Sequence, residues 1–130
     1  MSSAKQSISY SPATLSRAKR ALGCAPFRLG LFVAMRNESV PLQEIAAESR
    51  MGQYTRLTLS EGQIERELGW LIKVGVLRRE VDGQGITDSF RLTPLGRKLV
   101  ETWEPQGEIP PPSRQERFRN LWNRWLRGLP

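Results

Sequence analysis

The chain contains no histidine and a single cysteine, Cys24, among its 130 residues. An intramolecular disulfide needs two cysteines, and structural zinc sites are built mainly from cysteine and histidine. Both are therefore excluded within one chain, together with Ser-His-Asp and Cys-His catalytic groups. The sequence also contains no phosphate-binding loop. We therefore expect no metal, no cofactor, no catalytic residue and no enzymatic activity.

Long apolar runs are also absent. The longest run, residues 29–35, is much shorter than the roughly 18 residues that a membrane-spanning helix needs. The first ten residues contain no apolar stretch of the kind that secretory signal peptides have. These absences predict a cytoplasmic protein.

The chain does have an excess of positive charge, with a formal net charge of +7. This charge lies at the two ends, because residues 1–20 and residues 112–130 each carry +4, whereas residues 21–111 carry −1. A basic protein attracts polyanions such as nucleic acids. The near-neutral centre, however, does not by its charge alone indicate a strong DNA-binding surface.

Composition divides the chain into four segments. Residues 1–10 are polar and are predicted to be a disordered tail. Residues 11–103 contain the patterns of one folded domain. Residues 104–113 are rich in proline and predict a stiff linker, and residues 114–130 predict a basic, aromatic amphipathic helix.

Three helices are expected in the first half of the domain. The Ser11–Pro12 pair is a typical helix start. Apolar residues at helical spacing predict a central helix over residues 26–36. After a loop over residues 37–40, a short helix is predicted from Pro41 to Ser49. A connection over residues 50–58 follows.

The helix after this connection has the clearest boundaries. Ser60 and Gln63 have the spacing of a capping box, in which each side chain accepts a hydrogen bond from the other residue's backbone N–H. Gly75 is placed to end the helix in the left-handed conformation. The pattern therefore predicts a helix over about residues 60–74.

A β-hairpin is expected directly after this helix. Residues 76–81 and 86–92 have strand patterns, and residues 82–85 supply the glycines of a tight turn. The Thr93–Pro94 pair then starts a helix that runs to about Trp103. The expected fold class is mainly α with a small β-hairpin, or α+β.

Three segments carry the pattern of a known family: residues 41–46 (PLQEIA), residues 64–79, which end in VGVLRR, and residues 90–97 (FRLTPLGR). Through these segments, residues 26–103 resemble the winged helix-turn-helix transcriptional regulators of the MarR and PadR type. Three helices, a two-stranded wing and a further helix follow one another in the order of that fold.

This resemblance implies a DNA-binding transcriptional regulator with extra N- and C-terminal helices. The helix over about residues 60–74 would enter the major groove of double-stranded DNA, and the hairpin over residues 76–92 would lie on the DNA backbone. The terminal helices are compatible with the dimerisation helices of such regulators, so we expect a homodimer.

The outward face of the predicted recognition helix supplies the first candidate site. At about 100° per residue, Arg66 and Lys73 point away from the buried stripe, and Gln63 and Trp70 flank them. Arginine and glutamine suit base edges, and lysine suits a phosphate. The alternative is a solvated or protein-binding face with ordinary helix ion pairs.

The hairpin and the connection add further candidates. Arg78, Arg79 and Arg91 are placed to contact phosphates, and Arg56 is a weaker candidate. Ordinary cross-strand pairing of the three hairpin arginines with acidic neighbours is an equally open interpretation.

The C-terminal helix carries an apolar stripe at helical spacing. We expect these side chains to pack on the chain's own domain or on a second copy. The alternative is docking on another protein, which would make the chain a winged-helix adaptor, or protein-protein interaction module. A membrane-surface helix is the least favoured interpretation. The stripe consists of Phe118, Leu121, Trp122, Trp125 and Leu126.

Overall fold

The computed structural model of the chain describes residues 10–81 and 88–127. Within these ranges the fold is mainly α-helical with one small antiparallel sheet, which confirms the α+β class. In chain order the elements are α2 (Pro12–Cys24), α3 (Leu29–Ala34), β1 (Val40–Pro41), α4 (Leu42–Ser49), α5 (Glu61–Lys73), β2 (Leu77–Val81), β3 (Asp88–Leu92), α6 (Pro94–Trp103), the 3-10 helix η1 (Glu104–Gln106) and α7 (Arg114–Arg127).

The sheet has the strand order β1-β3-β2, and both pairings are antiparallel. β2 and β3 form the expected hairpin, while β1 adds a third strand through the pairing of Val40 with Phe90. The prediction of a loop and a helix start at Val40 and Pro41 is therefore wrong. A two-residue strand has no periodicity to detect, and its partner lies far along the chain.

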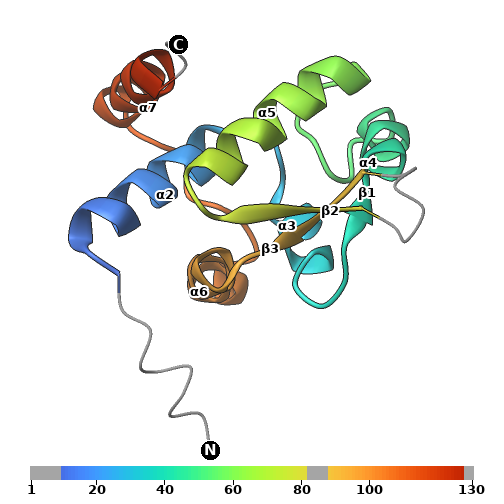
Figure 1. The fold of residues 1–130 in the computed structure, drawn as a ribbon, viewed down its shortest axis with the longest axis horizontal. Helices are drawn as coiled ribbons and strands as arrows, with labels where there is room; N and C mark the ends of the chain where they lie inside the picture. Colours follow the sequence, from blue (N-terminus) through green and yellow to red (C-terminus); the bar gives the residue numbers. More distant parts are fainter. Residues whose placement is uncertain (1–9, 82–87, 128–130) are drawn as a thin grey trace, which may run out of the picture.

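The helices cover the sheet from several sides. In Figure 1, α5 runs along one side of the β2–β3 hairpin, and α6 lies on the other. α4 lies at the β1 end of the sheet, whereas α2 lies at the opposite end and contacts both α5 and α7. α7 is at the periphery of the molecule, where α2 is its main neighbour.

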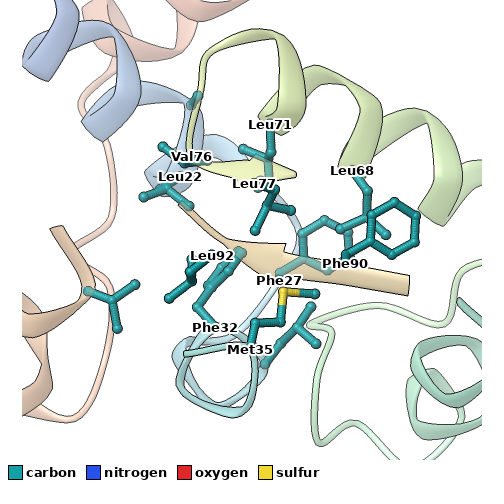
Figure 2. Packing of buried hydrophobic residues seen from close by; sticks show 14 of the residues in the cluster. Leu22, Phe27, Phe32, Met35, Leu68, Leu71, Val76, Leu77, Phe90 and Leu92 are labelled. Atoms are coloured by element: carbon teal, nitrogen blue, oxygen red, sulfur yellow. The ribbon is translucent and has the colours of Figure 1, made fainter. Parts of the chain in front are cut away.

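The core lies where α3, α5 and the hairpin meet. Figure 2 shows Leu71 from α5 beside Leu77 from β2, with Phe90 on β3 and Phe32 below the strands. Phe27 and Phe32 pack edge to face with 6.1 Å between ring centroids. These side chains are at most 2% exposed, so α5 is held against the sheet by its apolar stripe.

The central helix is shorter than the predicted range of residues 26–36. α3 covers only Leu29–Ala34, because the residues before it pair with the connection over residues 50–58. The backbone N–H of Arg56 donates to the carbonyl of Pro26, and that of Arg28 to the carbonyl of Tyr54. Apolar spacing alone cannot reveal hydrogen bonds to a distant segment, which here hold the backbone extended.

Several predicted helix boundaries are confirmed. Ser11 accepts a hydrogen bond from the N–H of Thr14 at the start of α2. Ser60 and Gln63 form the complete capping box of α5, and Gly75 follows α5 with a φ of +90°. The predicted turn over residues 82–85 lies outside the described residues, as does the predicted tail apart from Tyr10.

The proline-rich segment over residues 104–113 packs along the domain. It begins with η1, in which Glu104 accepts two hydrogen bonds from the guanidinium of Arg36, at 2.5 and 2.6 Å. Ile109 is only 4% exposed. Pro110 and Pro112 lie close to Gly23 of α2. The segment therefore guides α7 back onto α2.

Gly96 provides a test of the junction between α6 and the sheet. A Cβ at this position would overlap the carbonyl oxygen of Val76 and lie 2.8 Å from Leu92 Cδ2. We expect Gly96→Ala to lower the free energy of unfolding by roughly 2 kcal/mol or more in denaturant titrations.

Gly69→Ala is the matched control for this substitution. Gly69 lies in α5, and a Cβ there would meet no heavy atom within 4 Å beyond its own stretch of helix. Alanine at this position should raise the free energy of unfolding by roughly 0.5–1 kcal/mol. If Gly96→Ala behaved like this control, the close approach of α6 to Val76 would be wrong.

The Arg36–Glu104 pair predicts a pH dependence of stability. The hydrogen bonds from Arg36 hold the pKa of Glu104 below its ordinary value of 4.5. A lowered folded-state pKa stabilises the fold above the unfolded-state pKa, and this contribution is lost as the pH falls through the folded-state value. Glu104→Gln should therefore lower the melting temperature at about pH 7 and have little effect near about pH 3.

Glu108→Gln serves as the control, because the side chain of Glu108 is exposed and forms no ion pair with a described residue. Its effect on the melting temperature should be small at both pH values. An equal effect of Glu104→Gln at both pH values would contradict the stabilising role of the ion pair.

Candidate nucleic-acid interface

The exposed face of α5 carries the two central candidates. Arg66 and Lys73 are both exposed, as the helical spacing predicts. Neither forms an ion pair with any residue in the described ranges. Gly62 lies one turn before Arg66 on this side of the helix, and Gly69 lies between Arg66 and Lys73 beside Trp70. This face is open to a polyanion.

The two acidic residues on the flanks of this face form ion pairs with arginines from outside α5. On one flank, Arg79 of β2 lies 3.7 Å from the carboxylate of Glu65 and is shared with Asp88, which lies 3.1 Å from it. On the other flank, Arg124 of α7 lies 2.9 Å from the carboxylate of Glu67 and donates a hydrogen bond to it. The charge of Glu67 is therefore balanced and that of Glu65 is partly balanced, which the sequence alone does not reveal.

Gln63 is exposed at the start of α5, but part of its side chain is already in use. Its Oε1 atom accepts a 2.9 Å hydrogen bond from the backbone N–H of Ser60 in the capping box. Bidentate recognition of adenine needs both the oxygen and the nitrogen of a glutamine amide. Gln63 can therefore offer only its NH₂ group while the cap is intact.

The prediction that Trp70 flanks an exposed reading face is wrong. Trp70 is only 6% exposed because α7 covers it. Its indole N–H donates a 3.1 Å hydrogen bond to Asn120 Oδ1, and the guanidinium of Arg124 lies 5.8 Å from the Trp70 ring centroid. Helical periodicity places Trp70 beside the outward face, but only tertiary packing shows that another helix occupies that position.

Asn120 and Arg124 are structural contacts that the sequence does not predict. Both residues are on the polar side of α7, and Asn120 is only 8% exposed. A buried asparagine has no distinguishing sequence pattern, since asparagine is mostly a surface residue. The spacing of four residues, which puts both side chains on one face of α7, is the only sequence signal available.

The hairpin arginines take part in a local network of ion pairs. Arg78 lies 2.8 Å from Glu80, and Arg91 lies 3.9 Å from the same carboxylate. Arg79 lies 3.1 Å from Asp88 and stacks on the ring of Phe90. The two pairs that cross between the strands favour the cross-strand alternative for Arg79 and Arg91. Arg78 pairs within its own strand and has the most exposed side chain of the three.

Arg56 lies in a different neighbourhood from the hairpin arginines. It lines a polar hollow of about 450 Å³ together with Arg28, Gln53 and residues from the 107–111 segment. Its backbone is fixed by the pairing with Pro26. The contacts of Arg56 therefore connect it to α3 and the proline-rich segment.

The apolar stripe of α7 faces away from the domain. Of the two expected packing partners, the chain's own domain is therefore wrong, since Asn120 and Arg124 make the contacts instead. Packing on a second copy stays a prediction. The five stripe side chains are between 45% and 66% exposed, and the rings of Trp122 and Trp125 lie 5.6 Å apart. No helix in the described ranges is both long enough and apolar enough to cross a membrane.

A comparison with protein families gives one match. The model of the family described as Npun_F0494-like matches residues 8–124, which include every described helix and strand except the last turn of α7. The chain belongs to this family. A search of curated proteins and a search of solved structures each find no match.

The docking of α7 in this Npun_F0494-like chain predicts that mutation of Asn120 lowers the stability of the fold. Asn120→Ala leaves the buried indole N–H of Trp70 without its acceptor, so we expect the free energy of unfolding to fall by roughly 1–3 kcal/mol. Urea titrations, with proteolysis at the 107–111 segment as a second readout, measure this loss.

Asn123→Ala is the control, because Asn123 is half-buried on the same helix and its side chain makes no hydrogen bond to a described residue. It should change the free energy of unfolding by less than about 0.5 kcal/mol. Equal stability of the Asn120 and Asn123 variants would contradict the docked position of α7.

Proposed function

We propose that the chain is a winged helix-turn-helix protein that binds double-stranded DNA and regulates transcription. The order α3, β1, α4, α5, β2, β3 supports this assignment, as does the small antiparallel sheet at the end of the helical core. In a winged helix of this order, α5 is the recognition helix and the β2–β3 hairpin is the wing.

One observation carries the proposal. α5 presents Arg66 and Lys73 without ion-pair partners among the described residues, while Arg79 and Arg124 form ion pairs with the acids on its flanks. An exposed helix face with unpaired cations attracts the phosphate backbone. A recognition helix meets the major groove with such a face.

The proposal gives each residue on this face a different role. Arg66 is central on the face and has the donor geometry that guanine recognition requires. Lys73 is at the C-terminal end of α5 and suits a backbone phosphate. Arg78, on the wing, is the hairpin arginine with the most exposed side chain, so it supplies a second backbone contact.

Fluorescence anisotropy with a labelled random-sequence duplex tests the proposal. The affinity of the wild-type protein should fall linearly as the logarithm of the salt concentration rises. The variant Arg66→Glu/Lys73→Glu should bind at least roughly tenfold more weakly and show a shallower salt slope, because two phosphate-facing cations are replaced.

The control is Arg50→Glu/Lys98→Glu, which makes the same change in net charge at exposed positions of other elements. This control variant should keep most of its affinity for the DNA duplex. No binding by the wild-type protein at about 50 mM salt would refute DNA binding. Equal losses in the two double variants would show attraction by overall charge rather than binding through α5.

The other sequence-based predictions stay proposals. A homodimer would place two copies of α5 about 34 Å apart, so that they meet successive major grooves of DNA. The adaptor alternative gains support from one observation, the exposure of the α7 stripe. We also retain the proposal that the protein has no enzymatic activity and acts in the cytoplasm.

A further inference from the structure

The outward face of α7 carries five of the eight large hydrophobic side chains that are exposed in the described ranges. It consists of Phe118, Leu121, Trp122, Trp125 and Leu126, and every one of these side chains is at least 45% exposed. The opposite side of the helix is fixed to the domain by Asn120 and Arg124. The stripe therefore cannot turn inward unless both contacts break.

Positive charge borders this stripe on both sides. At about 100° per residue, Arg119 lies along one edge of the stripe and Arg117 along the other, and Arg114 lies in line with the stripe at the start of the helix. All three arginines are exposed. Lys19 of the neighbouring helix α2 is exposed as well. The one acidic residue of α7, Glu116, caps its own helix by accepting a hydrogen bond from the N–H of Ser113.

We propose that this face of α7 docks on the surface of an anionic lipid bilayer. A helix with tryptophan, phenylalanine and leucine on one face and arginine along the edges has the composition of interfacial helices. Tryptophan rings are favoured at the level of the lipid headgroups. The arginines at the edges would meet lipid phosphates while the stripe enters the boundary of the acyl chains.

A second copy of the chain fits this face less well. In a parallel pair of α7 helices packed stripe to stripe, Arg114 and Arg119 of each copy would lie beside those of the other, and like charges repel. Each exposed side chain offers roughly 100 Å², so the stripe offers about 500 Å². A stable protein interface buries about 800 Å² on each partner.

The shape of the face also favours a bilayer over a protein partner. A protein partner would have to supply an apolar groove that receives this helix, because α7 lies on the periphery of the molecule (Figure 1). Beside the stripe, Phe118 and Trp122 line a hollow of about 280 Å³ that also contains Arg20. Ordinary ligand pockets are larger. A fluid bilayer accommodates a protruding helix without a preformed groove.

Vesicle co-sedimentation of the full chain tests the proposal. One set of vesicles contains equal parts of phosphatidylglycerol and phosphatidylcholine, and the other contains phosphatidylcholine alone. The wild-type protein should sediment with the anionic vesicles and at least roughly tenfold less with the neutral ones. Brominated acyl chains should quench its tryptophan fluorescence, since Trp122 and Trp125 are exposed.

Two variants distinguish insertion of the α7 stripe into the bilayer from electrostatic attraction of a basic protein to anionic lipid. Trp122→Ala/Trp125→Ala keeps every charge, and it should bind anionic vesicles at least roughly tenfold more weakly. Arg114→Gln/Arg119→Gln keeps the stripe, and its affinity for anionic vesicles should fall by a similar factor. The matched controls are Met51→Ala/Leu57→Ala and Arg50→Gln/Arg56→Gln, which remove exposed groups elsewhere and should bind like the wild-type protein.

Each other outcome would overturn the proposal. Absence of binding to anionic vesicles refutes it, and so does binding that Trp122→Ala/Trp125→Ala leaves unchanged. If light scattering finds a dimer that this variant converts to a monomer, and vesicles do not bind, the face is an interface between copies. The DNA-binding test uses Arg66 and Lys73 on α5, so it can fail independently of this one.

Discussion

The buried indole N–H of Trp70 needs a hydrogen-bond acceptor, and the way it obtains one decides the arrangement of both candidate surfaces. The acceptor is Asn120 of α7, and the Arg124–Glu67 ion pair lies one helical turn away on the same side of α7. Two directional contacts fix the rotation of α7 about its own axis. The same contacts also bury the side of α5 that carries Trp70.

This orientation of α7 changes the charge of the α5 surface and the polarity of the α7 surface. On α5 it removes the negative charge of Glu67 and leaves Arg66 and Lys73 as unpaired cations among the described residues. On α7 it turns the polar side inward, so the apolar stripe faces outward. A regulator that binds DNA through α5 and a bilayer through α7 would have two anionic partners, each recognised by a different helix.

The extent to which the fold could be predicted differs between its elements. Capping boxes, prolines at helix starts and the glycine after α5 act over a few residues, so the sequence predicts most boundaries of α2, α5 and α6 correctly. The strand at Val40 and the extended backbone at Phe27 depend on partners far along the chain. No local pattern encodes these partners, and both predictions there are wrong.

The sequence by itself determined the helical periodicities, the capped ends and the outward position of Arg66 and Lys73, because these features depend on neighbours within one or two turns. Only the tertiary structure decided that Trp70 is covered, that Glu65 and Glu67 have arginine partners and that the α7 stripe is exposed. An amphipathic pattern shows that a helix has two different faces. Which face turns inward depends on the hydrogen bonds and charges that the neighbouring helix offers, and here α5 offers an indole N–H and a carboxylate.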